Sequence, residues 1–275
     1  MDPRTGGLDS LIEKGSRREW VQAHGQYGFG QLVHEAVVHP EGREAVRNFA
    51  RMIALGVASE SLRQNFPDAR IFEHNTPHIT NEPCYQTGPV FDQIMLDSAQ
   101  DRIGNVRIIW RIYHQVPLVE LVLEWNKLWS ELPEAAYVAF PFAAHDAHLE
   151  LETSGGFFQP GSHEACGQLP GTCSTYYTVQ GAARITSDGA SLLWLPLDAP
   201  LVMPNEIKYN RWDIDPWHWN GFLASMPVNH YWHTNFPTSQ RGLLRLRYRV
   251  YCPDASVKDE TALQTALPLE ALGWR

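Results

Sequence analysis

Apolar and polar residues alternate along most of this chain, which is the pattern of a β-strand with one buried face. In the range 243–250 every second residue is apolar, beginning at Leu244, and three arginines lie on the other side. The ranges 106–113 and 118–125 alternate in the same way, and the short segment between them contains Val116 and Pro117. We expect these two strands to form a hairpin, with Pro117 at its turn or at a strand start.

The same period predicts further strands and very little helix. The predicted strands cover residues 31–38, 52–58, 84–96, 135–142, 148–152, 176–184 and 191–197, and the short helical candidates are 41–49 and 60–65. Long antiparallel strands over most of the chain favour an all-β fold, a large antiparallel two-layer sandwich in one domain over 1–275. Two irregular segments interrupt the pattern, at 153–175 and 200–238, and loops of this length in a compact domain are usually functional or mobile.

The charge and cysteine content narrow the class of partner. A net charge of −9 with a pI near 5.7 argues against nucleic acid or an anionic membrane surface, because both require a basic patch. No apolar run approaches the roughly 20 residues of a membrane span, and the polar N-terminus is not a signal peptide. We therefore expect a cytoplasmic protein. No two of its four cysteines form a C-x-x-C pair; Cys166 and Cys173 could bridge, but free or buried thiols are expected.

Tryptophan is abundant, with 10 residues, and a ring face packs well on the apolar face of a pyranose. Most of these rings are expected in the core. The residues expected to bind a sugar lie in two polar, aromatic segments near the C-terminus: Trp217, His218, Trp219, Trp232, His233, Asn235 and Gln240. The alternative is structural: Trp232 would plug one end of the sandwich, and Asn235 and Gln240 would satisfy backbone groups of the turn before the strand at 243–250.

Candidate catalytic acids lie beside these tryptophans. Asp213 and Asp215 would point to the same side of an extended segment, and two close carboxylates can divide acid and base roles. The alternative is that both are solvated loop acids beside Pro216. In His145-Asp-Ala-His148, strand spacing separates the two histidines onto opposite faces, so structural histidines are expected there and no metal site.

Motifs along the chain resemble, in order, the C-terminal β-sandwich of family 38 glycoside hydrolases, the α-mannosidases and their relatives. The matching segments are Gly7-Leu-Asp-Ser-Leu11 with Lys14, Arg18 and Glu19, Tyr27-Gly-Phe-Gly-Gln31, Trp125-Asn126-Lys127, Pro133-Glu134-Ala135, Ala139-Phe-Pro-Phe142, Leu197-Asp198-Ala-Pro-Leu201, and Tyr231-Trp232-His-Thr-Asn235-Phe236 with Gln240. The resemblance covers residues 6–251 and leaves 252–275 as a C-terminal extension.

The resemblance implies a galactose-mutarotase-like supersandwich that supports a separate catalytic domain. In that family the zinc ligands and the nucleophilic aspartate lie on the catalytic domain, so no cofactor is expected in this chain, and the partners expected are a carbohydrate and either an upstream catalytic domain or further copies of the chain. Two alternatives stay open: a free-standing glycosidase or aldose epimerase that uses Asp198, Asp213 or Asp215 with His218 or His233, and a purely structural sandwich. Glu134 is expected to pair with Lys127 or to cap.

Overall fold

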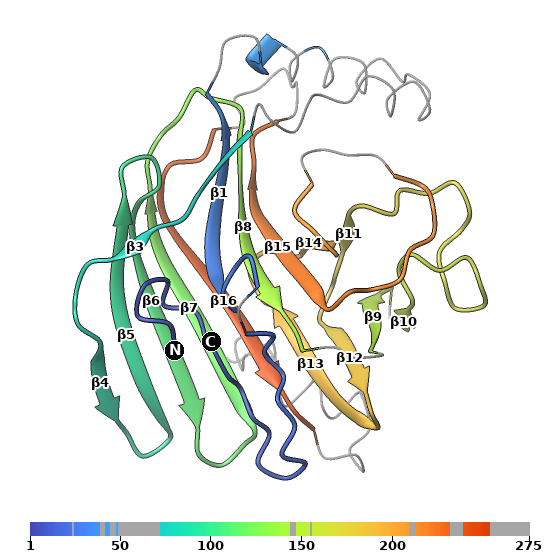
Figure 1. The fold of residues 1–275 in the computed structure, drawn as a ribbon, viewed down its shortest axis with the longest axis horizontal. Coiled ribbons are helices and arrows are strands. Elements are labelled where there is room, and N and C mark those ends of the chain that lie inside the picture. Colours follow the sequence, from blue (N-terminus) through green and yellow to red (C-terminus); the bar gives the residue numbers. More distant parts are fainter. Residues whose placement is uncertain are drawn as a thin grey trace.

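The computed structural model describes residues 1–23, 25–38, 42–44, 48, 72–143, 147–154, 156–208, 213–231 and 239–253. Within these ranges the chain forms two antiparallel sheets, one of six strands and one of ten. The described helical residues are 42–44 and 48, inside the predicted helix at 41–49. The prediction of an all-β, two-layer fold is confirmed (Figure 1).

The six-stranded sheet gathers strands from distant parts of the sequence. Its order is β11 (Tyr177–Thr178), β14 (Leu201–Pro204), β15 (Phe222–Asn229), β8 (Glu134–Pro141), β1 (Gln31–Val37) and β2 (Phe72–Asn75). β8 and β1 are buried along their whole length, as expected for strands in the middle of a sheet that is covered on both faces.

The ten-stranded sheet contains the longest strands. Its order is β10 (Gly156–Phe158), β9 (His148–Thr153), β12 (Ala183–Ser187), β13 (Ala190–Pro196), β16 (Gly242–Tyr251), β7 (Leu118–Lys127), β6 (Gly104–Tyr113), β5 (Phe91–Gln100) and β3 (His78–Ile79), and β4 (Cys84–Thr87) pairs with β5. The predicted hairpin is β6 with β7, and β16 pairs with β7 over ten residues. Leu246, Tyr248 and Val250 of β16 are buried, as the alternation predicts.

The main core lies between the two sheets. Phe140 of β8 contacts Trp194 of β13 and Tyr248 of β16, with ring centroids 5.0 Å apart in both pairs. Trp110 and Trp125 from the ten-stranded sheet are also fully buried, and their indole N–H groups donate to the carbonyls of Gly6 and Ile103. These rings bury the apolar faces of both sheets and leave no indole nitrogen of Trp110 or Trp125 without a partner.

A buried ion cluster joins the sheets at one end of this core. The carboxylate of Glu134 on β8 accepts hydrogen bonds from Lys127, at the end of β7, and from His34 Nε2 on β1 at 2.8 Å. His230, after β15, brings its Nδ1 within 3.4 Å of the same carboxylate. The predicted pairing of Glu134 with Lys127 is confirmed, and all four side chains are at most 4% exposed.

The opposite face of the six-stranded sheet carries a second apolar cluster. Val33, Tyr137, Met203 and Met226 belong to it, and they alternate along their strands with residues of the main core. Glu35 is buried in this face, where its Oε1 accepts hydrogen bonds from the hydroxyl groups of Tyr137 at 3.1 Å and Tyr231 at 2.8 Å. This face therefore holds a second buried carboxylate, separate from Glu134.

Several predicted strand limits differ from the structure. The predicted strand 84–96 divides into β4 and β5 at Gly88, and the predicted strand 176–184 divides into β11 and β12. The segment 200–238, predicted to be irregular, contains β14 and β15. Its strands lack alternation because both faces are covered, and β15 has a register shift between Ser225 and Val228 around Pro227. Residues 52–58 and 60–65 lie outside the described residues.

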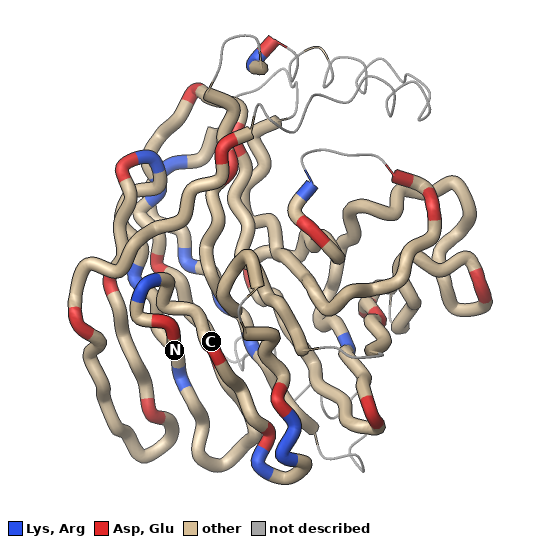
Figure 2. Tube along the Cα trace, in the orientation of Figure 1, with Lys and Arg blue, Asp and Glu red and all other residues tan. Residues whose placement is uncertain are grey.

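Charged residues of both signs are mixed along the chain (Figure 2), and the cysteines are unpaired. Lys and Arg positions are interspersed with Asp and Glu along the trace (Figure 2). All four cysteines are free, so Cys166 and Cys173 are not joined in this structure. Within the described ranges, no helical segment has the length and hydropathy of a membrane span.

Candidate functional site

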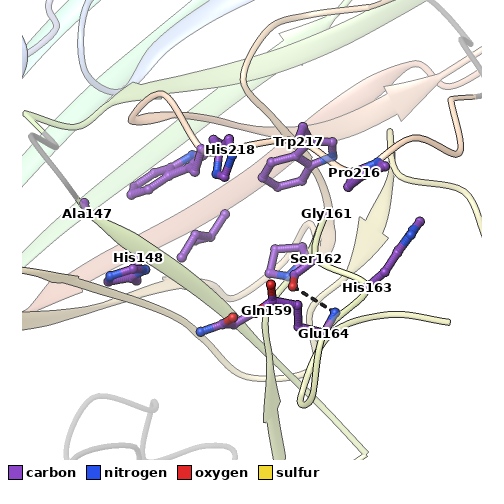
Figure 3. Close-up of a pocket in the computed structure, with 13 residues that line it drawn as sticks. Ala147, His148, Gln159, Gly161, Ser162, His163, Glu164, Pro216, Trp217 and His218 are labelled. Atoms are coloured by element: carbon purple, nitrogen blue, oxygen red, sulfur yellow. Dashed lines mark hydrogen bonds between the residues drawn. The ribbon is translucent and has the colours of Figure 1, made fainter. Parts of the chain in front are cut away.

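The clearest candidate site is a cavity of about 810 Å³ that we call the tryptophan cleft (Figure 3). It forms where the loop after β10 meets the loop before β15 and the start of β9. Its lining consists of Ala147, His148, Leu149, Gln159, Pro160, Gly161, Ser162, His163, Glu164, Pro216, Trp217, His218 and Trp219. Three of the residues predicted to bind a sugar, Trp217, His218 and Trp219, are therefore brought together here.

Trp217 lines the cleft and is fixed by two hydrogen bonds to backbone carbonyls. Its Nε1–H donates to the carbonyl of Ser174 at 2.7 Å, and its backbone N–H donates to the carbonyl of Gly161 at 3.0 Å. Gly161 has φ +74°, and a Cβ placed on it would lie 2.4 Å from the indole ring. Only glycine therefore permits this close approach of backbone and ring.

Trp219 is anchored in a similar way on the other side of His218. Its Nε1–H donates to the carbonyl of Phe222 at 2.8 Å, and its ring lies 6.1 Å from that of Phe142, with which it joins the main core. Both indole N–H groups of the cleft are thus already bonded to backbone. What Trp217 and Trp219 can offer a ligand is ring surface, held at low entropic cost.

Polar groups stand around these rings. His148, His163, His218 and Glu164 are exposed, and Gln159 and Ser162 are partly buried. Ser162 Oγ accepts the backbone N–H of Glu164 at 3.2 Å, which fixes the tip of this loop. The sequence did not single out Gln159, Ser162 or Glu164 as binding residues. The signal that could have found them is the long Gly- and Pro-rich segment 153–175 in which all three lie.

The acids proposed as catalytic lie elsewhere. Asp198 forms a bidentate ion pair with Arg247 of β16, in which the Nε–Oδ2 and Nη2–Oδ1 distances are both 2.9 Å. Asp198 also accepts the backbone N–H of Arg247. Asp213 Oδ2 lies 3.4 Å from Lys208 Nζ, and Asp215 is exposed. None of these three acids is part of the described lining of the cleft.

The described lining of the cleft contains none of the remaining predicted residues. Trp232, His233 and Asn235 lie outside the described residues, and Gln240 is exposed but not part of the described lining. His145 and Asp146 are also outside the described residues. Among the residues that the structure describes, no three His, Cys, Asp or Glu side chains are grouped so that they could hold a metal ion.

Comparison with solved structures finds a similar fold in one portion of larger proteins. The chain is similar to an α-mannosidase from Enterococcus faecalis V583, with a TM-score of 0.52 at 9% identity over 88% of this chain and 27% of that one. A second structure, a glycosyl hydrolase family 38 protein from Enterococcus faecalis, gives 0.52 at 8% identity over 88% and 28%. No protein-family model matches the sequence, and no curated protein matches it.

These similarities define the class of fold. The chain is a two-sheet β-sandwich that resembles one portion of a family 38 α-mannosidase and spans little more than a quarter of the length of those proteins. This agrees with the fold that the sequence motifs imply. At 8–9% identity, the likeness concerns the fold alone.

Proposed function

We propose that this chain is a carbohydrate-binding β-sandwich that supports the active site of a family-38-like glycoside hydrolase and holds a sugar in the tryptophan cleft. The observation that carries the proposal is the pair of anchored rings, Trp217 and Trp219, beside exposed histidines in one cavity. The fold shared with a portion of family 38 α-mannosidases supports the assignment to that class of protein.

The chemistry of the lining suits a neutral sugar. Indole faces pack against the C–H groups of a pyranose, and the side chains of His148, Gln159 and His218 can exchange hydrogen bonds with its hydroxyl groups. The volume of about 810 Å³ lies within the usual range for small-ligand sites, roughly 300–1,000 Å³. A mono- or disaccharide is the size of ligand that we expect.

The same lining favours binding over hydrolysis. Glycosidases of the usual kind place two carboxyl groups on either side of the bond that they break. Among the described lining residues, Glu164 is the one carboxylate, and Asp198, Asp213 and Asp215 lie outside the lining. We therefore expect the catalytic acids of such an enzyme to come from another part of the assembly.

Calorimetric titration of the purified chain with a panel of methyl glycosides tests the proposal. Trp219→Ala and His218→Ala are expected to weaken the binding of the best ligand by about tenfold or more, equivalent to about 1.4 kcal/mol. Trp129→Ala is the matched control, because Trp129 is 55% exposed and lies outside the described lining of the cleft. An equal loss in the Trp129 variant, or no binding by the wild type to any glycoside, would contradict the proposal.

An activity assay of the purified chain distinguishes a domain that supports a separate catalytic domain from a glycosidase that acts alone. With aryl α-mannosides and other aryl glycosides, with zinc or with EDTA, we expect no turnover by the purified chain. Turnover that disappears in Asp213→Asn or Asp215→Asn would instead identify a free-standing glycosidase. That result would overturn the supporting role but would leave sugar binding in the cleft to be judged by the titration.

A further inference from the structure

A second cavity, of about 550 Å³, opens beside the face of the six-stranded sheet that carries Glu35. Its lining consists of Gln22, Gly25, Gln26, Tyr27, His74, Pro141, Asn205, Glu206, Ile207, Asn220 and Phe222. It lies where the loop before β1, the end of β14 and the start of β15 meet the edge strand β2. Its described lining shares no residue with that of the tryptophan cleft.

A chain of hydrogen bonds leads from a buried carboxylate to this cavity. Glu35 Oε2 is bonded to His74 Nε2, and His74 Nδ1 lies 3.2 Å from the Tyr27 hydroxyl. Gln26 Nε2 donates to the same hydroxyl at 3.1 Å. The carboxyl group of Glu35 is only 3% exposed, whereas the His74 side chain is 32% exposed and forms part of the cavity wall.

The direction of these hydrogen bonds follows from the partners of Glu35. Its carboxylate already accepts from two tyrosine hydroxyls, and it also accepts the N–H of His74 Nε2. In the neutral imidazole His74 Nδ1 is then an acceptor, and the Tyr27 O–H donates to it. Burial, and next the charge of Glu35, raise the pKa of Tyr27 to about 12, so the phenol keeps its proton at neutral pH.

This arrangement determines what the cavity offers to a ligand. Because the Tyr27 proton points to His74 and Gln26 donates to the same oxygen, the phenol keeps one lone pair for a ligand, and the Gln22 amide in the wall can donate or accept. A ligand that bonds to Tyr27 must therefore supply the hydrogen-bond donor. The rings of Tyr27 and Phe222, with centroids 6.3 Å apart, give it an apolar surface.

The charged side chains described around this cavity disfavour an anionic ligand. Glu35 lies behind His74, and Glu206 stands in the wall. Lys208, which pairs with Glu206 at 2.9 Å, is shared with Asp213 at 3.4 Å. Among the residues that the structure describes here, two carboxylates face this lysine and Glu35 adds a third, so these groups together give a negative potential.

We propose that this cavity is a second small-molecule site, which binds a hydroxyl-bearing ring compound that is neutral or positively charged. Tyr27 is the binding residue, and His74 and Glu35 are positioning residues that hold its proton away from the ligand. The proposal stands whether or not the tryptophan cleft binds sugar, because the two sites rest on different residues.

Three sugars that differ mainly in charge test the site: glucosamine, glucose and glucuronate. Calorimetry on the His218→Ala variant, in which binding in the tryptophan cleft is expected to be about tenfold weaker, should give the tightest binding for glucosamine and the weakest for glucuronate, with about a tenfold span. Tyr27→Phe keeps the ring and removes the oxygen, so it should weaken glucosamine binding several-fold. Tyr85→Phe is the matched control, because Tyr85 is 70% exposed on β4 and is not part of the described lining.

Two further variants test whether Glu35 positions the Tyr27 proton or only stabilises the fold. Glu35→Gln should reduce the preference for glucosamine over glucuronate, which a purely structural role would leave unchanged. If that buried substitution prevents folding, Gln26→Ala at the exposed rim serves instead and should weaken all three ligands by a similar factor. Glucuronate binding as tightly as glucosamine, or no binding of any of the three at 50 mM, about the limit of weak sugar sites, would overturn the proposal.

Discussion

At the scale of single residues, the tryptophan cleft depends on one contact between backbone and ring. Gly161 has a positive φ and faces the indole of Trp217, so any side chain there would both strain the backbone and displace the ring. Gly171, further along the same loop region, has φ +83° but no atom within 4 Å of a Cβ placed on it. Comparing substitutions at Gly161 and Gly171 therefore separates backbone strain from displacement of the indole ring.

We predict that Gly161→Ala lowers the free energy of unfolding by about 2–5 kcal/mol and abolishes ligand binding in the cleft. Gly171→Ala should cost only the strain of a left-handed backbone, about 1–2 kcal/mol, and should keep binding. Urea denaturation and calorimetric titration of both variants provide the measurement. Equal effects of the two substitutions on binding would show that the contact with Trp217 is unimportant.

The sequence could predict some of these residues but not their partners. Trp217, His218 and Trp219 stood out because aromatic and polar groups are dense in that segment, and they do line one cavity. Asp198 was proposed as a catalytic acid, and the structure pairs it with Arg247, which is 49 residues away in the sequence. Local patterns do not show a contact of that kind.

At the scale of elements, the Glu134 cluster joins β7 of the large sheet to β8 and β1 of the small one. Burial by itself would raise the pKa of Glu134, but hydrogen bonds from His230, His34 and Lys127 outweigh it and hold the pKa well below its usual range. The carboxylate is therefore ionised and fully partnered in the folded protein. Removing it would leave the buried ammonium of Lys127 without its counter-charge.

Glu134→Ala is accordingly expected to destabilise the fold by about 3–5 kcal/mol. The control is Asp97→Asn, which breaks an ion pair with Arg107 on neighbouring strands whose side chains are 44% and 53% exposed. That exposed pair should contribute no more than about 1 kcal/mol. Chemical denaturation at neutral pH measures both, and a Glu134 variant as stable as the Asp97 variant would contradict a joining role.

The same cluster predicts a pH dependence with a definite sign. Because the pKa of Glu134 is lower in the folded than in the unfolded state, its stabilisation is complete above the unfolded value of about 4.3 and is lost as the pH falls below it. The difference in unfolding free energy between wild type and Glu134→Gln should shrink between about pH 5 and pH 2.5. A difference that is constant over this range would show that the charge of Glu134 does not stabilise the fold.

Strand prediction succeeded for the alternating strands and for the fully buried strands β1 and β8, but it missed β14 and β15. β16 and the β6–β7 hairpin alternate clearly and were predicted nearly to their ends. β15 is buried on both faces, and Pro227 distorts its register, so its sequence shows no period of two. Pairings such as β1 with β8, about 100 residues apart, follow from neither strand alone.

At the scale of the whole molecule, the chain has the two-sheet fold of one portion of a family 38 α-mannosidase and two cavities on different parts of that fold. The order of the sequence motifs anticipated this likeness, although identity to the solved structures is only 8–9%. Alternation indicated the sandwich, whereas the cavities are formed by loops that meet only in three dimensions. For that reason the sites could be predicted only in part.

The central claim is that a sugar binds on Trp217 and Trp219, and the most direct measurement follows the indole N–H signals in a ¹H–¹⁵N NMR titration. Single Trp→Phe variants assign the signals. On addition of the best methyl glycoside, we predict saturable shifts for Trp217 and Trp219 and no shift for the buried Trp194 or the exposed Trp129. Unchanged Trp217 and Trp219 signals at ligand concentrations that saturate binding would contradict the account.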